Sequence, residues 1–156
     1  MIRFRLLALT VVVATLAIFA TGCDSIQNAI YKSAIEKAIH EDSLTGHESS
    51  YDHTNAMRKV DLSNCPPEFR EAYSKHIHAW EESAAVKQAR AKLDTEADAA
   101  AVGGMLASIF GSDETPWSDH LQAIQELNRL DGIASGDIHT TWQSVEDVAR
   151  KYGAQI

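Results

Sequence analysis

The sequence predicts an all-α protein, a small helical bundle of about four to five helices after an N-terminal signal peptide. Several stretches repeat apolar residues every three or four positions, which is the period of an α-helix. No stretch shows the alternation of β-branched and polar residues that is typical of strands. Prolines, glycines and capping residues fall at the ends of the helical stretches, where they start and stop helices.

The first 22 residues have the three-part layout of an export signal. Arg3 and Arg5 supply a positive start, and an apolar run of 15 residues follows over 6–20. This run is short for a membrane span, which needs about 20 residues. The alternative is a short anchor helix at the N-terminus that is never removed.

The residues Ala20-Thr21-Gly22-Cys23 resemble the lipobox of bacterial lipoprotein precursors. The resemblance implies that the Cys23 thiol receives a diacylglyceryl group and that signal peptidase II cuts between Gly22 and Cys23. Two or more acyl chains anchor a protein stably to a bilayer. The expected location is therefore the extracytoplasmic side of a bacterial cell membrane, with the bilayer bound through Cys23. Asp24 resembles the signal that retains enteric lipoproteins in the inner membrane.

Composition limits the possible partners of the mature chain. Loss of Arg3 and Arg5 with the signal peptide changes the formal charge from −8 to −10. So acidic a chain is not expected to bind nucleic acid or to grip anionic lipid through a basic patch. With Cys23 modified, Cys65 is the one remaining cysteine, so no disulfide within the chain is expected. A lone thiol of this kind is buried, paired between chains, or reactive.

The start of the mature chain reads as one helix and one loop. Residues 24–40 have helical composition, and this helix is expected to pack on the body or to lie near the bilayer. Residues 41–55 are polar and rich in Ser, Thr, Gly and Asp, which predicts a loop. We therefore divide the mature chain into 23–55, the anchor, first helix and polar linker, and 56–156, a helical domain.

A long helix is predicted from Pro67 to about Leu93, because a proline suits the first helical turn. One stripe at helical spacing is expected to be a buried core face or a binding face; it consists of Phe69, Tyr73, His76 and Trp80. The block D-L-S-x-x-P-x-x-F-x-x-A-Y-x-x-H-x-x-A-W resembles uncharacterised bacterial proteins, and no activity is implied by that resemblance.

Residues 97–111 are small and apolar, and they predict a helix or hinge buried in the core. The alternative is a segment at the membrane interface or against a partner. Beyond it, Thr115 and Pro116 are expected to open a helix that ends at Gly132 and at the SGD of residues 135–137.

A last helix is predicted after residue 139. Thr140 and Gln143 fit a capping box at its start, and Gly153 is expected to stop it. Three tryptophans lie on the apolar stripes of the predicted helices, where core positions are expected; they are Trp80, Trp117 and Trp142.

The sequence contains no recognisable catalytic constellation. Cys65 is a candidate nucleophile, but His76 and His78 lie about three turns along the same helix and cannot reach it. The alternative base is a histidine that the fold brings near Cys65, which leaves His53, His120 and His139 as candidates. The seven histidines show no metal-binding spacing, so no metal or other cofactor is expected. His76 falls on the apolar stripe, where a core histidine with a hydrogen-bond partner is expected; the alternative is a pH-sensitive switch.

These observations favour a lipid-anchored, extracytoplasmic helical module that binds or scaffolds an unknown protein partner. Self-association is a further possibility for such a module. The alternative is a small cell-envelope enzyme that uses Cys65 or a histidine. Homologous sequences would discriminate between these functions, since an enzyme would keep exposed polar residues unchanged.

Overall fold

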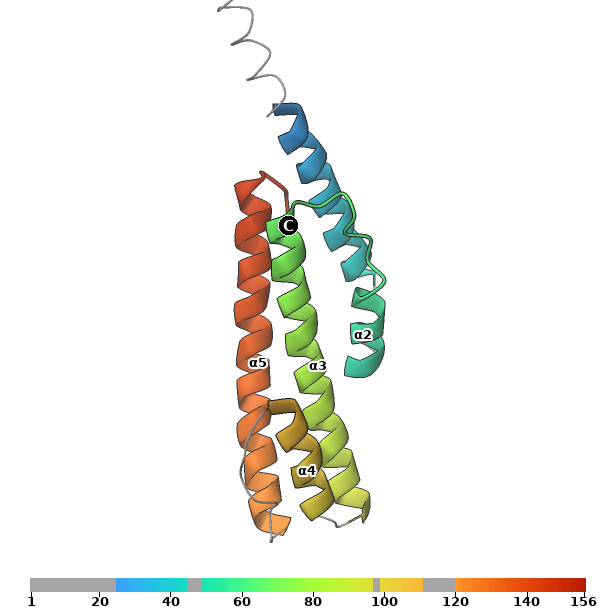
Figure 1. Ribbon diagram of the computed structural model, residues 1–156, viewed down its shortest axis with the longest axis vertical. Helices are drawn as coiled ribbons and strands as arrows, with labels where there is room; N and C mark the ends of the chain where they lie inside the picture. Colours follow the sequence, from blue (N-terminus) through green and yellow to red (C-terminus); the bar gives the residue numbers. More distant parts are fainter. Residues whose placement is uncertain (1–24, 45–48, 97–98, 111–119) are drawn as a thin grey trace, which may run out of the picture.

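The computed structural model describes residues 25–44, 49–96, 99–110 and 120–156. These residues form five helices and no strand, which confirms the all-α prediction (Figure 1). The helices are the N-terminal helix over 25–43, α2 (Ser50–Met57), α3 (Pro67–Glu96), α4 (Ala99–Phe110) and α5 (His120–Lys151). The predicted signal peptide and Cys23 lie outside the described residues.

Helices α3 and α5 run antiparallel and form the spine of the bundle (Figure 1). The N-terminal helix and α2 cover one half of this spine, and α4 covers the other half. None of the helices in the described part of the chain has both the length and the apolar character that a membrane crossing requires.

The prediction of a long helix from Pro67 is confirmed, and α3 continues three residues beyond Leu93. Its first turn is closed by the carbonyl of Pro66, which accepts the N–H groups of Phe69 at 3.0 Å and Arg70 at 3.1 Å. Proline has no backbone N–H, but at Pro67 this costs no hydrogen bond, because the first N–H groups of a helix have no partner within it.

Two core clusters lie along the spine. The first cluster joins the N-terminal helix, α2, the start of α3 and the end of α5; it includes Ile35, Met57, Phe69, Tyr73, Val145 and Ala149. The second cluster joins the end of α3, α4 and the start of α5; it includes Val86, Leu93, Val102, Leu106, Ala123 and Leu127. The burial of Val102 and Leu106 confirms that the small apolar segment contributes to the core.

The predicted loop over 41–55 is wrong, because it contains the end of the N-terminal helix and most of α2. The side chain of Ser49 caps α2 by accepting the backbone N–H of Asp52 at 3.1 Å. Asp52 also places a negative charge in the first turn, where the helix dipole favours it. Met57, 1% exposed in the first cluster, fixes the helix to the body. Tertiary packing therefore overrides the polar composition of this segment.

The predicted break between two C-terminal helices is also wrong, since α5 continues through Gly132 and Gly136. The apolar face of α5 holds the helix against α3 on both sides of these glycines. Thr140 does not cap a helix: its hydroxyl donates to the carbonyl of Gly136, one turn earlier in α5, at 2.9 Å. The predicted helix start at Thr115 and Pro116 lies outside the described residues, as does Trp117.

Gly153 ends α5, as the sequence predicts. It has a positive φ of 72°, a conformation that glycine adopts without strain. The N–H of Gly153 donates to the carbonyl of Arg150 at 2.9 Å, and that of Ala154 donates to Ala149 at 3.0 Å. This is a Schellman motif, and the burial of Ala154 in the first cluster completes it.

Candidate functional site

A cleft lies beside the middle of α3, at the edge of the first core cluster. Its volume is about 420 Å³, which is within the usual range for small-molecule sites, roughly 300–1,000 Å³. The N-terminal helix, α2, α3 and α5 all contribute to its walls. The lining residues are Ile39, Asp42, Ser43, His53, His76, Trp80, Ser135, Ile138, His139 and Trp142. We call it the ring cleft.

Four rings form a row along this cleft, alternating imidazole and indole. His53 of α2 meets Trp80 of α3 edge to face, with ring centroids 4.5 Å apart. His76, one turn before Trp80, lies 6.4 Å from it and 5.1 Å from Trp142 of α5. Edge-to-face contacts of this kind are favourable between aromatic rings. Three helices are therefore held together at one place by polar aromatic side chains.

The hydrogen bonds of His76 determine which ring nitrogen carries its proton. The indole N–H of Trp80 can only donate, and it lies 3.2 Å from Nε2 of His76, so Nε2 is the acceptor. The proton is then on Nδ1, which donates to the hydroxyl oxygen of Thr141 at 2.9 Å. The Thr141 hydroxyl donates in turn to the carbonyl of Asp137 at 2.6 Å. Both nitrogens of a neutral imidazole are thus satisfied.

The same arrangement keeps His76 uncharged. Its side chain is 4% exposed, and burial lowers the pKa of His76 to about 4. The negative charge of Asp42 acts in the opposite direction but is the smaller effect. A strongly perturbed histidine in a cleft is one physical mark of a functional site.

Asp42 brings a carboxylate to the ring cleft from the end of the N-terminal helix. It is 9% exposed, and its Oδ1 accepts the phenol O–H of Tyr73 at 2.9 Å. Burial, and then the charge of Asp42, raise the pKa of Tyr73 well above its ordinary value. Tyr73 therefore stays neutral and holds the carboxylate in place as a donor.

The stripe of Phe69, Tyr73, His76 and Trp80 divides between the core and the cleft. Phe69 and Tyr73 are fully buried in the first cluster, and their rings stack 6.0 Å apart. His76 and Trp80 line the ring cleft, and Trp80 also packs against the first cluster. Trp80 is half-buried rather than fully buried, and it packs against the first core cluster as a core position would. The expectation of a hydrogen-bonded core histidine at His76 agrees with the structure.

Sequence reasoning missed three contributors to the cleft, because each comes from a different helix. Asp42 and His53 fall in the segment assigned to a loop, and His139 is the first residue of the stretch assigned to the last helix. The signal that could have recovered His53 is Ser49 followed by Asp52, an N-cap with an acidic first turn.

Cys65 lies in the first core cluster, away from the cleft lining. It is 3% exposed, and burial raises the pKa of its thiol. A helix start can lower a thiol pKa, but here desolvation is the larger effect. A thiol with these properties is a poor nucleophile.

The exposed His78 is not part of the cleft lining, and its ring nitrogens lie 3.4 Å from Glu81 and 3.3 Å from Glu82. No group of three or more potential metal ligands occurs within the part of the chain that the structure describes.

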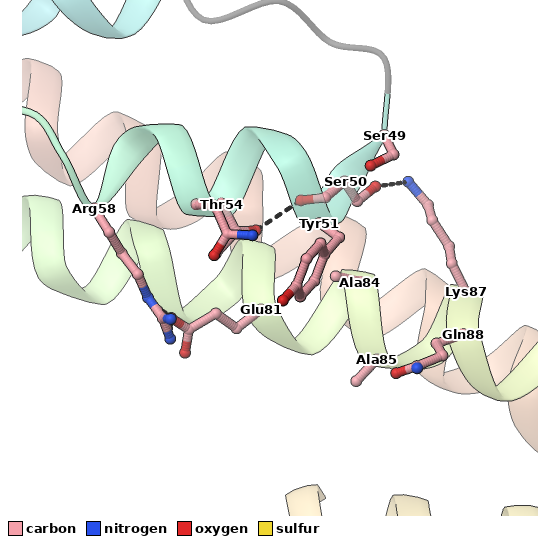
Figure 2. Close-up of a pocket in the computed structure, with 11 residues that line it drawn as sticks. Ser49, Ser50, Tyr51, Thr54, Arg58, Glu81, Ala84, Ala85, Lys87 and Gln88 are labelled. Atoms are coloured by element: carbon pink, nitrogen blue, oxygen red, sulfur yellow. Dashed lines mark hydrogen bonds and ion pairs between the residues drawn. The ribbon is translucent and has the colours of Figure 1, made fainter.

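A second hollow, the polar groove, runs between α2 and α3, and its volume is about 830 Å³ (Figure 2). Its polar side chains largely satisfy one another. Lys87 donates to the Ser50 hydroxyl at 2.6 Å, and Arg58 pairs with Glu81 at 2.5 Å. The ring cleft, with its buried titratable groups, is therefore the stronger candidate for a functional site.

Comparisons of this chain with protein-family models, with curated proteins and with solved structures found no match.

Proposed function

We propose that this protein is a lipid-anchored lipoprotein of the bacterial cell envelope that binds a partner or ligand at the ring cleft. The ring cleft itself carries the binding part of this proposal. Two half-buried indoles, a buried neutral imidazole and a buried carboxylate converge there from three helices. A mostly apolar hollow with a few fixed polar groups is the usual form of a binding site.

The anchoring part rests on the lipobox-like residues Ala20 to Cys23 and is supported by the apolar surface of the N-terminal helix. The first turns of this helix expose Ile26 and Ile30, whose relative exposures are 64% and 49%. Apolar side chains that begin three residues after an acylated cysteine would be held at the bilayer surface, where burial in the interface is favourable. Farther along the same helix, Ile35 and Ala38 pack into the first cluster and so connect this surface to the body.

The alternative of a small envelope enzyme has less support. Cys65 is buried with a raised thiol pKa, and both ring nitrogens of His76 are already hydrogen-bonded to side chains of the protein. A general base needs a free lone pair within reach of the proton that it removes. Binding is therefore the role that this arrangement favours.

Site-specific photocrosslinking in the native membrane tests the use of the ring cleft. A photoreactive amino acid at Ser135, an exposed residue in the cleft lining, is expected to capture a partner or ligand. The same amino acid at Ser144, also exposed on α5 but outside the lining, is the matched control. Trp142→Ala should remove the adduct at Ser135. Equal adducts at both positions, or none at Ser135, would contradict the proposal.

A further inference from the structure

The ring cleft carries one type of permanent charge. Among the described residues that line it, Asp42 is the one acidic residue and none is Lys or Arg. Of the lining histidines, His76 is buried, and this burial lowers its pKa to about 4. The permanent charge that the cleft presents is therefore negative and lies within mostly apolar walls.

The walls of the cleft also favour a cation. Trp80 and Trp142 line it with indole rings, and indole is the side chain that attracts cations most strongly through its π face. Such an attraction is worth about 2 kcal/mol or more where water is excluded, against about 0.5–1 kcal/mol at exposed sites. Both indoles are half-buried, so their attraction is only partly screened by water.

The hydrogen bonds around the cleft hold these groups in position before a ligand arrives. Trp80 is held by its N–H donation to His76, and Asp42 is held by the donation from Tyr73. A preorganised site of this kind loses little free energy to ordering when it binds.

We propose that the ring cleft binds an organic ammonium cation, held by the carboxylate of Asp42 and the indole rings of Trp80 and Trp142. This inference rests on the proposed use of the cleft as the ligand site and adds the chemical class of the ligand. The formal charge of the whole chain, −8, favours the approach of a cation as well.

Choline and 3,3-dimethylbutan-1-ol test the proposal, because the two molecules have nearly the same shape and differ in charge. Isothermal titration of the full chain in non-ionic detergent is expected to give choline an affinity at least about tenfold higher than that of the neutral alcohol. Ethanolamine, a primary ammonium, is expected to bind more tightly than the neutral alcohol as well. These comparisons use the unaltered protein, so they do not depend on the folding of a variant.

Two variants that each remove one negative charge complete the test. Asp42→Asn keeps an acceptor for Tyr73 and is expected to weaken choline binding at least about tenfold. Glu71→Gln removes an exposed carboxylate that pairs with Lys75 at 2.7 Å on another face of α3, and it should leave the affinity unchanged.

The outcomes separate this inference from the proposed function. Choline and the neutral alcohol could bind equally, with Trp142→Ala abolishing the binding of both. That result would overturn the preference for a cation, while the cleft would remain a ligand site. If choline does not bind, or binds as tightly to Asp42→Asn as to the wild type, the inference is overturned. The crosslinking at Ser135 then decides by itself whether the cleft is used at all.

Discussion

At the scale of single residues, His76 connects the stability of the bundle to its candidate site. Its imidazole joins Trp80 of its own helix to Thr141 of α5, and it does so only in the neutral form. If Nε2 were protonated, its N–H would face the indole N–H of Trp80. Both groups are donors and the indole nitrogen cannot accept, so this hydrogen bond would be lost. Burial of the imidazole lowers the pKa of His76 to about 4, so the neutral form that these hydrogen bonds need is also the form that burial favours.

We expect the protein to lose stability as the pH falls from about 6.5 towards 4. In this window the unfolded chain takes up a proton at His76 that the folded chain does not bind, so the free energy of unfolding falls with decreasing pH. Within this window, His76 alone changes the free energy of unfolding by up to about 1.4 kcal/mol for each pH unit.

Urea denaturation of the wild type and His76→Gln at several pH values measures the effect of His76. Glutamine can accept from Trp80 and donate to Thr141 but does not titrate. The free energy of unfolding of His76→Gln should therefore change less with pH than that of the wild type. Equal slopes would show that His76 is protonated as easily in the folded chain as in the unfolded chain.

Cys65 is expected to resist alkylation in the folded protein. The thiolate is the reactive form, and both burial and the raised thiol pKa make it scarce and inaccessible. Iodoacetamide should modify Cys65 more than about tenfold faster in denaturant than under native conditions. Rapid modification of the native protein would instead revive the interpretation of Cys65 as a reactive thiol.

At the scale of elements, α5 shows how packing decides where a helix ends. Gly132 and Gly136 lie on exposed positions inside it, and a Cβ atom added at either would meet nothing within 4 Å. Each glycine lowers the intrinsic stability of the helix, but the apolar residues before and after them pack against α3 and α4. The helix therefore continues where local propensity alone predicts a break.

We expect Gly136→Ala to raise the free energy of unfolding by about 0.5–1 kcal/mol, because alanine is the better residue in a helix interior. Gly153→Ala is the matched control and should lower it by about 1–2 kcal/mol, since the positive φ of 72° strains a residue with a Cβ atom. Thermal denaturation of the two variants shows whether each substitution stabilises or destabilises the protein. A destabilising Gly136→Ala would mean that α5 bends or breaks there.

The sequence was sufficient where one helix carries its own start, stripe and stop. Pro67 and the stripe beyond it predicted α3, and Gly153 predicted the end of α5. It was insufficient where a contact between helices decides the outcome. The polar segment that contains α2 becomes helical because Met57 is buried against the body, and the ring cleft requires His53, His76 and Trp142 from three helices. The residue pattern of a single segment does not predict which side chains of other helices it will contact.

At the scale of the whole molecule, the N-terminal helix links the proposed membrane anchor to the ring cleft. Its first turns expose Ile26 and Ile30, its middle packs in the first cluster, and its last turn supplies Asp42 to the cleft. The cleft would therefore lie about 25 Å from the bilayer surface if this helix stood upright, by the rise of about 1.5 Å per residue.

Asp24 offers a test of where the anchored protein resides. In an enteric bacterium, we expect the wild type to fractionate with the inner membrane and Asp24→Ser to shift towards the outer membrane. The expected shift comes from the resemblance of Asp24 to the retention signal of enteric lipoproteins. Recovery of the wild type mainly in the outer membrane would reject this placement and leave the lipid anchor itself untouched.

The intact mass of the mature protein, purified from membranes, tests the account most directly. We expect the loss of residues 1–22 and the gain of a diacylglyceryl group on Cys23, with or without a further acyl chain on its amino group. Cys23→Ser should remain unprocessed, and globomycin should block maturation of the wild type. A mature chain with an unmodified thiol at Cys23 would contradict the proposal that this protein is a lipid-anchored binding module.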